Sequence, residues 1–213
     1  MLNFLLTGFV LVTVVMLITA LRAWQYAMWY TEALHHPLYR RKSVIAMLDY
    51  YQGSFELEAR MSTVCDLYES EKGNAVVVLC VGQLKGSQDS FASIDKDKLI
   101  EKGISPADIF VHLGKREKGA ADTFEEVQLA CDFARKYECL FVVANPLQAA
   151  QAFMICIREG IVPIIECVPL YPIHPAYVGI KLFQILLTFY SPRGKNPISF
   201  LQKFWRRHIS NAV

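Results

Sequence analysis

The stretch from Cys139 to Gly160 limits most strongly what this chain can fold into. It opens with an apolar run, Cys139–Ala144, which is too short for a buried helix and rich in strand-forming residues. Asn145 then suits a helix N-cap, Pro146 suits the first helical position, and Gly160 suits the left-handed residue that ends a helix. Because a buried strand that turns directly into a helix is the unit of a parallel α/β sheet, the stretch predicts such a sheet.

Strand and helix patterns alternate along the middle of the chain. Four further apolar runs are short enough to be buried strands, and helical patterns separate them. Pro163 indicates that the last strand lies at a sheet edge or that Pro163 is among its first residues, because proline donates no ladder hydrogen bond. We therefore expect an α/β fold over residues 43–172, a three-layer α/β/α sandwich with a mainly parallel, Rossmann-like sheet. The expected strands are Ser43–Leu48, Ala75–Val81, Asp108–Leu113, Cys139–Ala144 and Ile161–Val168, and the expected helices are Phe55–Ser70, Ile94–Lys102 and one that begins near Thr123.

Two of these helices carry local signals in their first turns. Thr123 and Glu126 match a capping box, in which each side chain accepts a hydrogen bond from the other residue's backbone N–H. Glu56 and Arg60 stand one turn apart, and we expect a surface ion pair worth only about 0.2–0.5 kcal/mol.

The N-terminal segment predicts a membrane anchor. Leu2–Leu21 contains no charged side chain, and about 20 apolar residues span a bilayer. We expect a retained transmembrane helix over residues 1–23, followed by a juxtamembrane segment, 24–42, whose first residues are rich in Trp and Tyr. A cleaved signal peptide is the competing interpretation, but it would have a basic start, a shorter apolar core and a small-residue cleavage site.

Charge and cysteine patterns bear on the compartment and the partners. Arg22, Arg40, Arg41 and Lys42 follow the apolar segment and no Lys or Arg precedes it, which places the domain in the cytoplasm by the positive-inside rule. The six cysteines form no CxxC pair, so we expect buried free thiols rather than disulfides. We expect no cofactor. We also expect no metal site, because the sequence lacks metal-ligating residues at the spacing of a ligand set. The net charge of +2 gives no reason to expect nucleic acid.

The order of four segments carries a resemblance to a known family. The segments are SVIAMLDYYQGS, FELEARMSTVCDLYESEKGNAVVVLCVG, KDKLIEKGISPADIFVHLGKREKGAADTFEEVQLACDFA and FVVANPLQAAQAFMICIREGI. Together, over Ser43–Val168, they resemble the SanA/YdcF/ElyC family. The resemblance implies a single-pass protein of the bacterial inner (plasma) membrane, linked to envelope biogenesis, with its domain outside the cytoplasm. This side of the membrane is opposite to the one that the charge pattern favours.

The departures from the family pattern bear on function. Gln148 stands where the resemblance places a histidine, and Gln151 stands where it places an arginine. Cys80-Val81-Gly82 replaces a Gly-Gly pair, whereas Thr123 and Glu125 match the pattern. An amide exchanges no protons near neutral pH, and it lacks the charge with which guanidinium binds phosphate. The site that the resemblance implies is therefore degenerate.

The strand ends define a candidate ligand pocket, because parallel sheets bind ligands beyond the carboxyl ends of their strands. We assign no catalytic residue, because no histidine or arginine occurs in the segments at the predicted strand ends, which are Tyr51–Ser54, Gly82–Ser90, Ala121–Glu125 and Asn145–Gln151. We expect a binding or assembly subunit of a membrane complex. One alternative is a hydrolase of envelope precursors, with Asp49, Asp89, Thr123 and Glu125 as its candidate residues. The other, which the family resemblance implies, is a binder of nucleotide or S-adenosylmethionine type. The candidate pocket residues are Gly53, Ser54, Gly82, Lys85, Asp89, Thr123, Glu125, Asn145, Gln148 and Gln151.

The C-terminal tail, residues 173–213, predicts contact with a membrane or a protein. Lys181, Gln184 and Thr188 form a narrow polar stripe on an otherwise apolar helix over Gly179–Tyr190. Further on, an apolar helical face with basic neighbours is typical of a membrane interface, although docking on protein explains it equally well. The expected partners are therefore the lipid bilayer and other membrane proteins. The contact residues are Phe200, Phe204, Trp205, Arg206 and Arg207.

Overall fold

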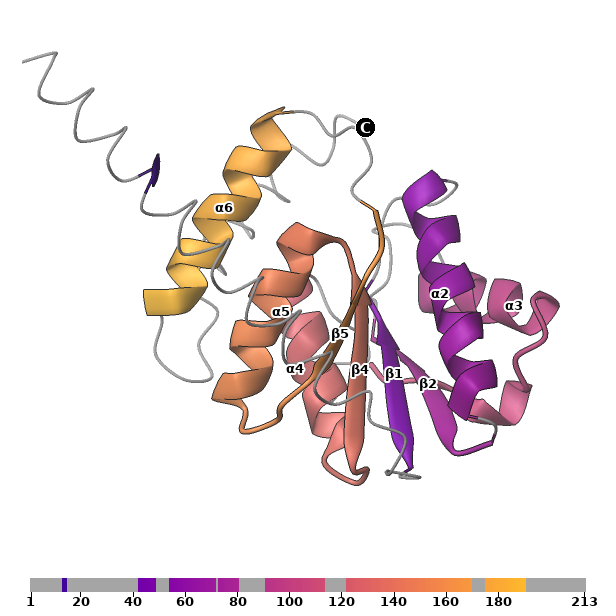
Figure 1. Ribbon diagram of the computed structural model, residues 1–213. Helices are drawn as coiled ribbons and strands as arrows, with labels where there is room; N and C mark the ends of the chain where they lie inside the picture. Colours follow the sequence, from indigo (N-terminus) through magenta and orange to yellow (C-terminus); the bar gives the residue numbers. More distant parts are fainter. Residues whose placement is uncertain are drawn as a thin grey trace, which may run out of the picture.

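The computed structural model describes residues 13–14, 42–48, 54–71, 73–80, 91–113, 122–169 and 175–190. Its centre is a five-stranded sheet with the order β3-β2-β1-β4-β5, and every pair of neighbouring strands is parallel (Figure 1). The strands are β1 (Ser43–Met47), β2 (Ala75–Leu79), β3 (Ile109–Val111), β4 (Cys139–Ala144) and β5 (Ile164–Cys167). The helices are α2 (Phe55–Glu71), α3 (Phe91–Glu101), the short 3₁₀ helix η1 (Pro106–Asp108), α4 (Thr123–Ala134), α5 (Pro146–Arg158) and α6 (Pro175–Tyr190).

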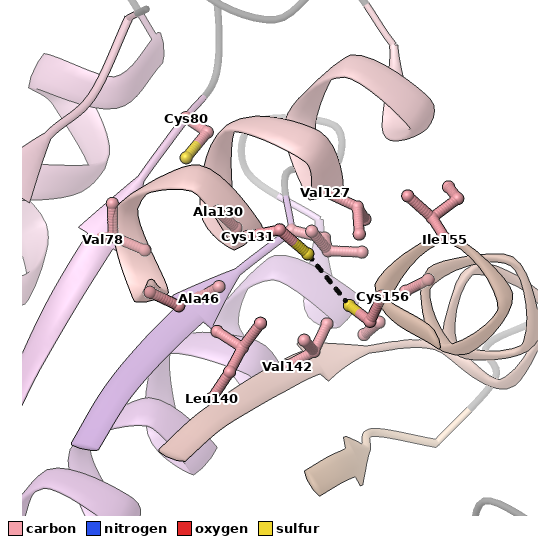
Figure 2. Packing of buried hydrophobic residues seen from close by; sticks show 14 of the residues in the cluster. Ala46, Val78, Cys80, Val127, Ala130, Cys131, Leu140, Val142, Ile155 and Cys156 are labelled. Carbon is pink, nitrogen blue, oxygen red and sulfur yellow. Dashed lines mark hydrogen bonds between the residues drawn. The ribbon is translucent and has the colours of Figure 1, made fainter. Parts of the chain in front are cut away.

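Helices cover both faces of the sheet, which explains why its inner strands β1, β2 and β4 are almost continuously apolar. Alternate residues of β1 point to opposite faces: Val44 and Ala46 pack in the cluster beneath α4 and α5, whereas Ile45 and Met47 pack with α2 and α3. Figure 2 shows the first of these clusters, in which small and branched side chains fill the space between sheet and helices. The fold is therefore an α/β sandwich with a Rossmann-like strand order, as the sequence predicts. Helix α6 adds to it by packing on the outside of α5 (Figure 1).

The strand order reverses direction between β1 and β4. From β1 the chain moves outward through β2 to β3, and then returns to place β4 on the other side of β1. Two loops that leave in opposite directions create a crevice at the carboxyl ends of such strands, and this is where parallel sheets usually bind ligands. β2 lies inside the sheet, as its continuous apolar sequence indicates, and β5 lies at an edge, which is one of the two alternatives that Pro163 indicates.

The expected elements exist, and their ends differ by a few residues. Asn145 caps α5 and Pro146 begins it, and Gly160 takes a positive φ of 78° beyond its last turn. Helix α3 begins at Phe91, ahead of the predicted start at Ile94. The strand expected over Ile161–Val168 is limited to Ile164–Cys167, because its first residues lead out of the turn around Gly160 instead of pairing with β4.

The predicted capping box at Thr123 is wrong. Asp122 is the N-cap of α4, and its side chain accepts a hydrogen bond from the Glu125 backbone N–H at 2.9 Å. Thr123 is the first helical residue, which frees its hydroxyl for contacts outside the helix end. Asp is the stronger N-cap of the two residue types, so Asp122, directly before Thr123, is the better capping residue.

Several predicted features lie outside the described residues. They include the apolar segment Leu2–Leu21, except for Thr13 and Val14, which are helical. Within the described residues, no helix is both long and apolar enough to cross a membrane. The pocket candidates Gly53, Gly82, Lys85 and Asp89, together with Asp49 and the tail contacts Phe200, Phe204, Trp205, Arg206 and Arg207, also lie outside the described residues.

Candidate functional site

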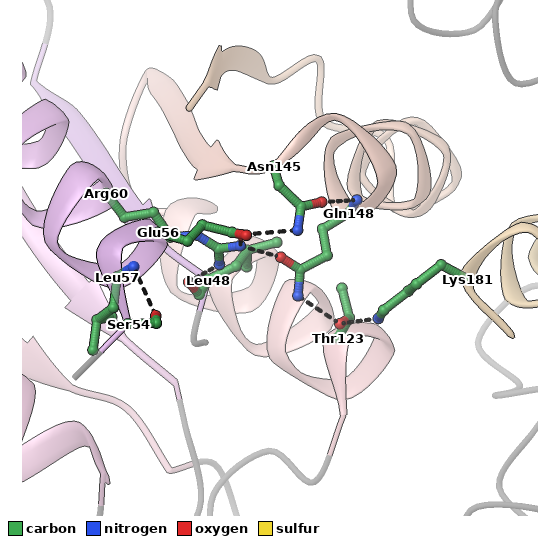
Figure 3. Close-up of polar contacts among 9 residues, drawn as sticks. All are labelled: Leu48, Ser54, Glu56, Leu57, Arg60, Thr123, Asn145, Gln148 and Lys181. Atoms are coloured by element: carbon green, nitrogen blue, oxygen red, sulfur yellow. Dashed lines mark hydrogen bonds and ion pairs between the residues drawn. The ribbon is translucent and has the colours of Figure 1, made fainter. Parts of the chain in front are cut away.

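A buried polar network lies at the carboxyl ends of β1 and β4, where the strand order reverses. Figure 3 shows that its side chains come from the first two turns of α2, the first turns of α4 and α5, and the middle of α6. These elements are far apart in sequence but meet at one end of the sheet, because each parallel strand delivers the following helix to the same edge. The network therefore occupies the position at which the sequence predicts a ligand pocket.

The centre of the network is an ion pair between Glu56 and Arg60. The two residues lie one helical turn apart on α2, and their side chains are 1% and 0% exposed. Arg60 also donates hydrogen bonds to the Leu48 carbonyl oxygen at the end of β1 and, at 2.5 Å, to Gln148 Oε1. Because a buried charge is tolerated only when it is paired and hydrogen-bonded, this guanidinium is held by three elements of the fold. The expectation of a weak surface pair is wrong.

Asn145 joins this ion pair to the start of α5. Its Oδ1 accepts a hydrogen bond from the Gln148 backbone N–H at 2.9 Å, which caps the helix, and its Nδ2 donates to Glu56 Oε1 at 2.8 Å. The side chain is fully buried. One residue therefore stabilises a helix terminus and satisfies a buried carboxylate at the same time.

Lys181 closes the network from α6. Its Nζ donates a hydrogen bond to Thr123 Oγ1 at 3.0 Å, and Gln148 Nε2 lies 3.4 Å from the same oxygen. Burial lowers the pKa of Lys181 to about 8, although the nearby carboxylates of Glu126 and Asp122 act in the opposite direction; Arg60 adds to the lowering. A continuous set of contacts thus runs from Arg60 through Gln148 and Thr123 to Lys181.

The other described candidates have different roles. Ser54 caps α2, since its Oγ accepts a hydrogen bond from the Leu57 backbone N–H at 3.1 Å. Gln151 faces α6 and donates from Nε2 to Thr188 Oγ1 at 3.3 Å, one turn beyond the network. Glu125 is half-buried, and its backbone N–H donates to the side chain of Asp122, the N-cap of α4. Of the predicted pocket residues, the structure brings Thr123, Asn145 and Gln148 into direct contact with one another or with the same partners.

Three members of the network are absent from the pocket residues that the sequence predicts, because they lie outside the strand-end loops. Glu56 and Arg60 come from a helix, and Lys181 comes from the tail. The strand-end loops contain no arginine, but helix α2 contributes Arg60 to the site. A signal was present: Glu56 and Arg60 precede Leu57 and Met61 by one position, so the buried face of α2 includes both pairs.

The network is largely satisfied by its own members. Within it Glu56 Oε2, and beside it Gln151 Oε1, are buried acceptors with no hydrogen-bond partner among the described residues. Within the same part of the chain, no three His, Cys, Asp or Glu side chains are placed to hold a metal ion. All six cysteines are free; Cys80, Cys131 and Cys156 are buried, and the other three are half-buried.

We find no family model, no curated protein and no solved structure that matches this chain. The relationship to the SanA/YdcF/ElyC family therefore stays a prediction from the order of its sequence motifs.

Proposed function

We propose that this protein is a membrane-anchored, SanA/YdcF-like binding or assembly subunit of a bacterial envelope complex, whose strand-end site no longer performs catalysis. One observation carries the proposal. The only guanidinium in the described network, that of Arg60, is 0% exposed and engaged by Leu48, Glu56 and Gln148. A guanidinium that holds the protein's own carboxylate and amide is not presented to a phosphate or carboxylate substrate.

The neighbouring groups support the same conclusion. Gln148 and Asn145 bridge the elements of the fold, and neither amide can exchange a proton near neutral pH. Hydrogen bonds between side chains of different elements, such as Arg60 to Gln148 and Asn145 to Glu56, hold those elements together. The network at the strand ends would then stabilise the folded domain, and other surfaces of the chain would contact partners.

A genetic experiment tests the proposal. The first variant replaces Asp89, Thr123 and Glu125 with alanine together, and the second replaces Phe204 and Trp205 with alanine. We expect the second variant to lose complementation of a deletion strain and to lose its large complex on native gels, while the first retains both. Loss of complementation by the first variant alone, with the complex intact, would contradict the proposal and favour an enzyme.

A matched control separates folding from chemistry. Thr123→Ala removes the oxygen that Lys181 and Gln148 contact, so it lowers stability for structural reasons as well. Thr123→Ser keeps that hydroxyl and removes only a methyl group. If the triple variant with serine at position 123 is as inactive as the alanine version and has wild-type thermal stability, the carboxylates are required for chemistry and the proposal fails.

Lys181 favours a second candidate, a hydrolase or a small-molecule binder. An amine with a pKa of about 8 lies within hydrogen-bond distance of the Thr123 hydroxyl, and its neutral form is able to accept a proton. The unpaired acceptors of Glu56 and Gln151 suit a ligand that donates hydrogen bonds. Thermal shifts measured with a nucleotide, with S-adenosylmethionine and with inorganic phosphate test this candidate. A stabilisation by any of them that Lys181→Met abolishes would establish binding at this site.

A further inference from the structure

Helix α6 carries its polar side chains on the face that contacts the domain. Lys181, Gln184 and Thr188 recur at intervals of three and four residues, so they share one side of the helix. Lys181 reaches Thr123 and Thr188 contacts Gln151, as described above, and Ile185 lies among them with 4% exposure. The polar stripe is therefore directed toward α4 and α5, as the position of Lys181 in Figure 3 illustrates.

The opposite side of α6 is apolar. Leu182, Phe183, Leu186 and Leu187 occupy the remaining described positions of the two central turns. Phe183 is 46% exposed, and the three leucines are half-buried. A surface helix normally directs its apolar stripe to the core and its polar face to water, and α6 has the reverse arrangement. Lys181 is the only charged residue in α6, so the outward face offers water no ionic group.

We propose that the outward face of α6, defined by Leu182, Phe183, Leu186 and Leu187, lies against an anionic lipid bilayer. The sequence that follows α6 supports a lipid partner. Residues 191–213 contain no Asp or Glu, and their basic residues are Arg193, Lys195, Lys203, Arg206 and Arg207. Basic residues near an anionic membrane are attracted to it, and an apolar helical face beside basic residues is typical of helices that lie in the interface.

The outward face of α6 could also be covered by a second copy of the chain or by the apolar segment Leu2–Leu21, and two arguments favour the bilayer over these. Each copy of the chain carries five basic and no acidic residues over 191–213, so these segments disfavour the approach of a second copy and favour that of an anionic bilayer. The apolar segment Leu2–Leu21 would lie in the bilayer core if it anchors the chain, so it would not cover a helix at the surface. The inference thus rests on the membrane anchor of the proposed function, which would hold α6 at the bilayer.

Photocrosslinking of the full-length chain tests this contact. The photoreactive residue p-benzoylphenylalanine replaces Phe183 in protein reconstituted into bilayers of phosphatidylcholine and phosphatidylglycerol. We expect lipid adducts by mass spectrometry, with a yield several-fold lower in phosphatidylcholine alone. Two positions serve as controls: Phe110, which is 39% exposed on β3 at the edge of the sheet away from α5, and Phe9 within the apolar N-terminal segment.

Each outcome decides between the occupants. Lipid adducts at positions 9 and 183 but not at 110 support the inference. Adducts to a second chain or to Leu2–Leu21, equal lipid yields at positions 110 and 183, or adducts at position 9 without any at 183 would overturn it. Lipid adducts at 183 without any at 9 would leave the α6 contact standing and refute the membrane anchor, so the two proposals fail separately.

Discussion

Arg60 Nη2 donates a hydrogen bond to Gln148 Oε1 over 2.5 Å, although 88 positions separate the two residues in sequence. This contact joins α2, which follows β1, to α5, which follows β4. It therefore links the helices that follow the two strands between which the strand order reverses, and it does so with a charged group that has no access to water. The stability of the domain should depend on that group more than on any surface charge.

Arg60→Met should lower the free energy of unfolding by about 3–5 kcal/mol, because it leaves the Glu56 carboxylate buried without its cation. Urea denaturation followed by circular dichroism measures the change. The double variant Glu56→Met/Arg60→Met removes both charges and should recover most of the loss. A cost below about 1 kcal/mol for the single variant would mean that the pair behaves like an exposed one.

Asn145→Ala should cost more than the loss of a helix cap alone. A cap is worth about 0.5–2 kcal/mol, and Asn145 also donates a hydrogen bond to the buried Glu56 carboxylate. Ser54→Ala provides the control, because Ser54 caps α2 and has no part in the network. Unfolding free energies of the two variants are compared directly, and equal losses would show that the contact with Glu56 contributes nothing.

Lys181 should make stability rise with pH in the alkaline range. Its pKa is lowered to about 8 in the folded protein from 10.5, so the unfolded chain binds more protons between these values. The free energy of unfolding therefore increases from pH 8 toward 10.5, by at most about 1.4 kcal/mol for each pH unit. Below pH 8 the cost of burying the charged amine is fully present.

The Lys181 effect is measured as a difference from Lys181→Met, which has no titrating amine. The subtraction also removes the opposite trend from Cys80 and Cys156, whose raised pKa values weaken the fold as the unfolded thiols ionise. The stability advantage of Lys181→Met over wild type should shrink between pH 8 and 10.5. A constant difference across that range would show that the folded pKa is not lowered.

The buried thiols should react slowly in the native protein. Cys131 and Cys156 lie with their sulfur atoms 3.4 Å apart between α4 and α5 (Figure 2), and contact with Cys131 together with burial raises the pKa of Cys156. Because the thiolate is the reactive form, titration with an aromatic disulfide reagent should label Cys80, Cys131 and Cys156 quickly only after denaturation. Rapid labelling of all six cysteines in the native state would show that α4 and α5 separate readily.

The sequence alone determined the secondary structure and the class of fold. The apolar run Cys139–Ala144 and the residues Asn145, Pro146 and Gly160 predicted β4, α5 and both ends of that helix, and the structure agrees. These predictions succeed because they depend on local physics: strand length, N-cap chemistry and the conformational freedom of glycine act over a few residues. The carboxyl edge of the sheet could be located in the same way.

Tertiary structure alone decided which side chains meet at that edge. Glu56–Arg60 matches a surface ion pair in sequence, and only the packing of α2 against β1 and α5 makes it buried. Lys181 belongs to a tail helix, yet it reaches Thr123 across 58 positions and thereby turns the apolar side of α6 outward. Local patterns report whether a helix is amphipathic but not which of its faces meets the domain, because that choice depends on hydrogen bonds available only once distant elements have packed.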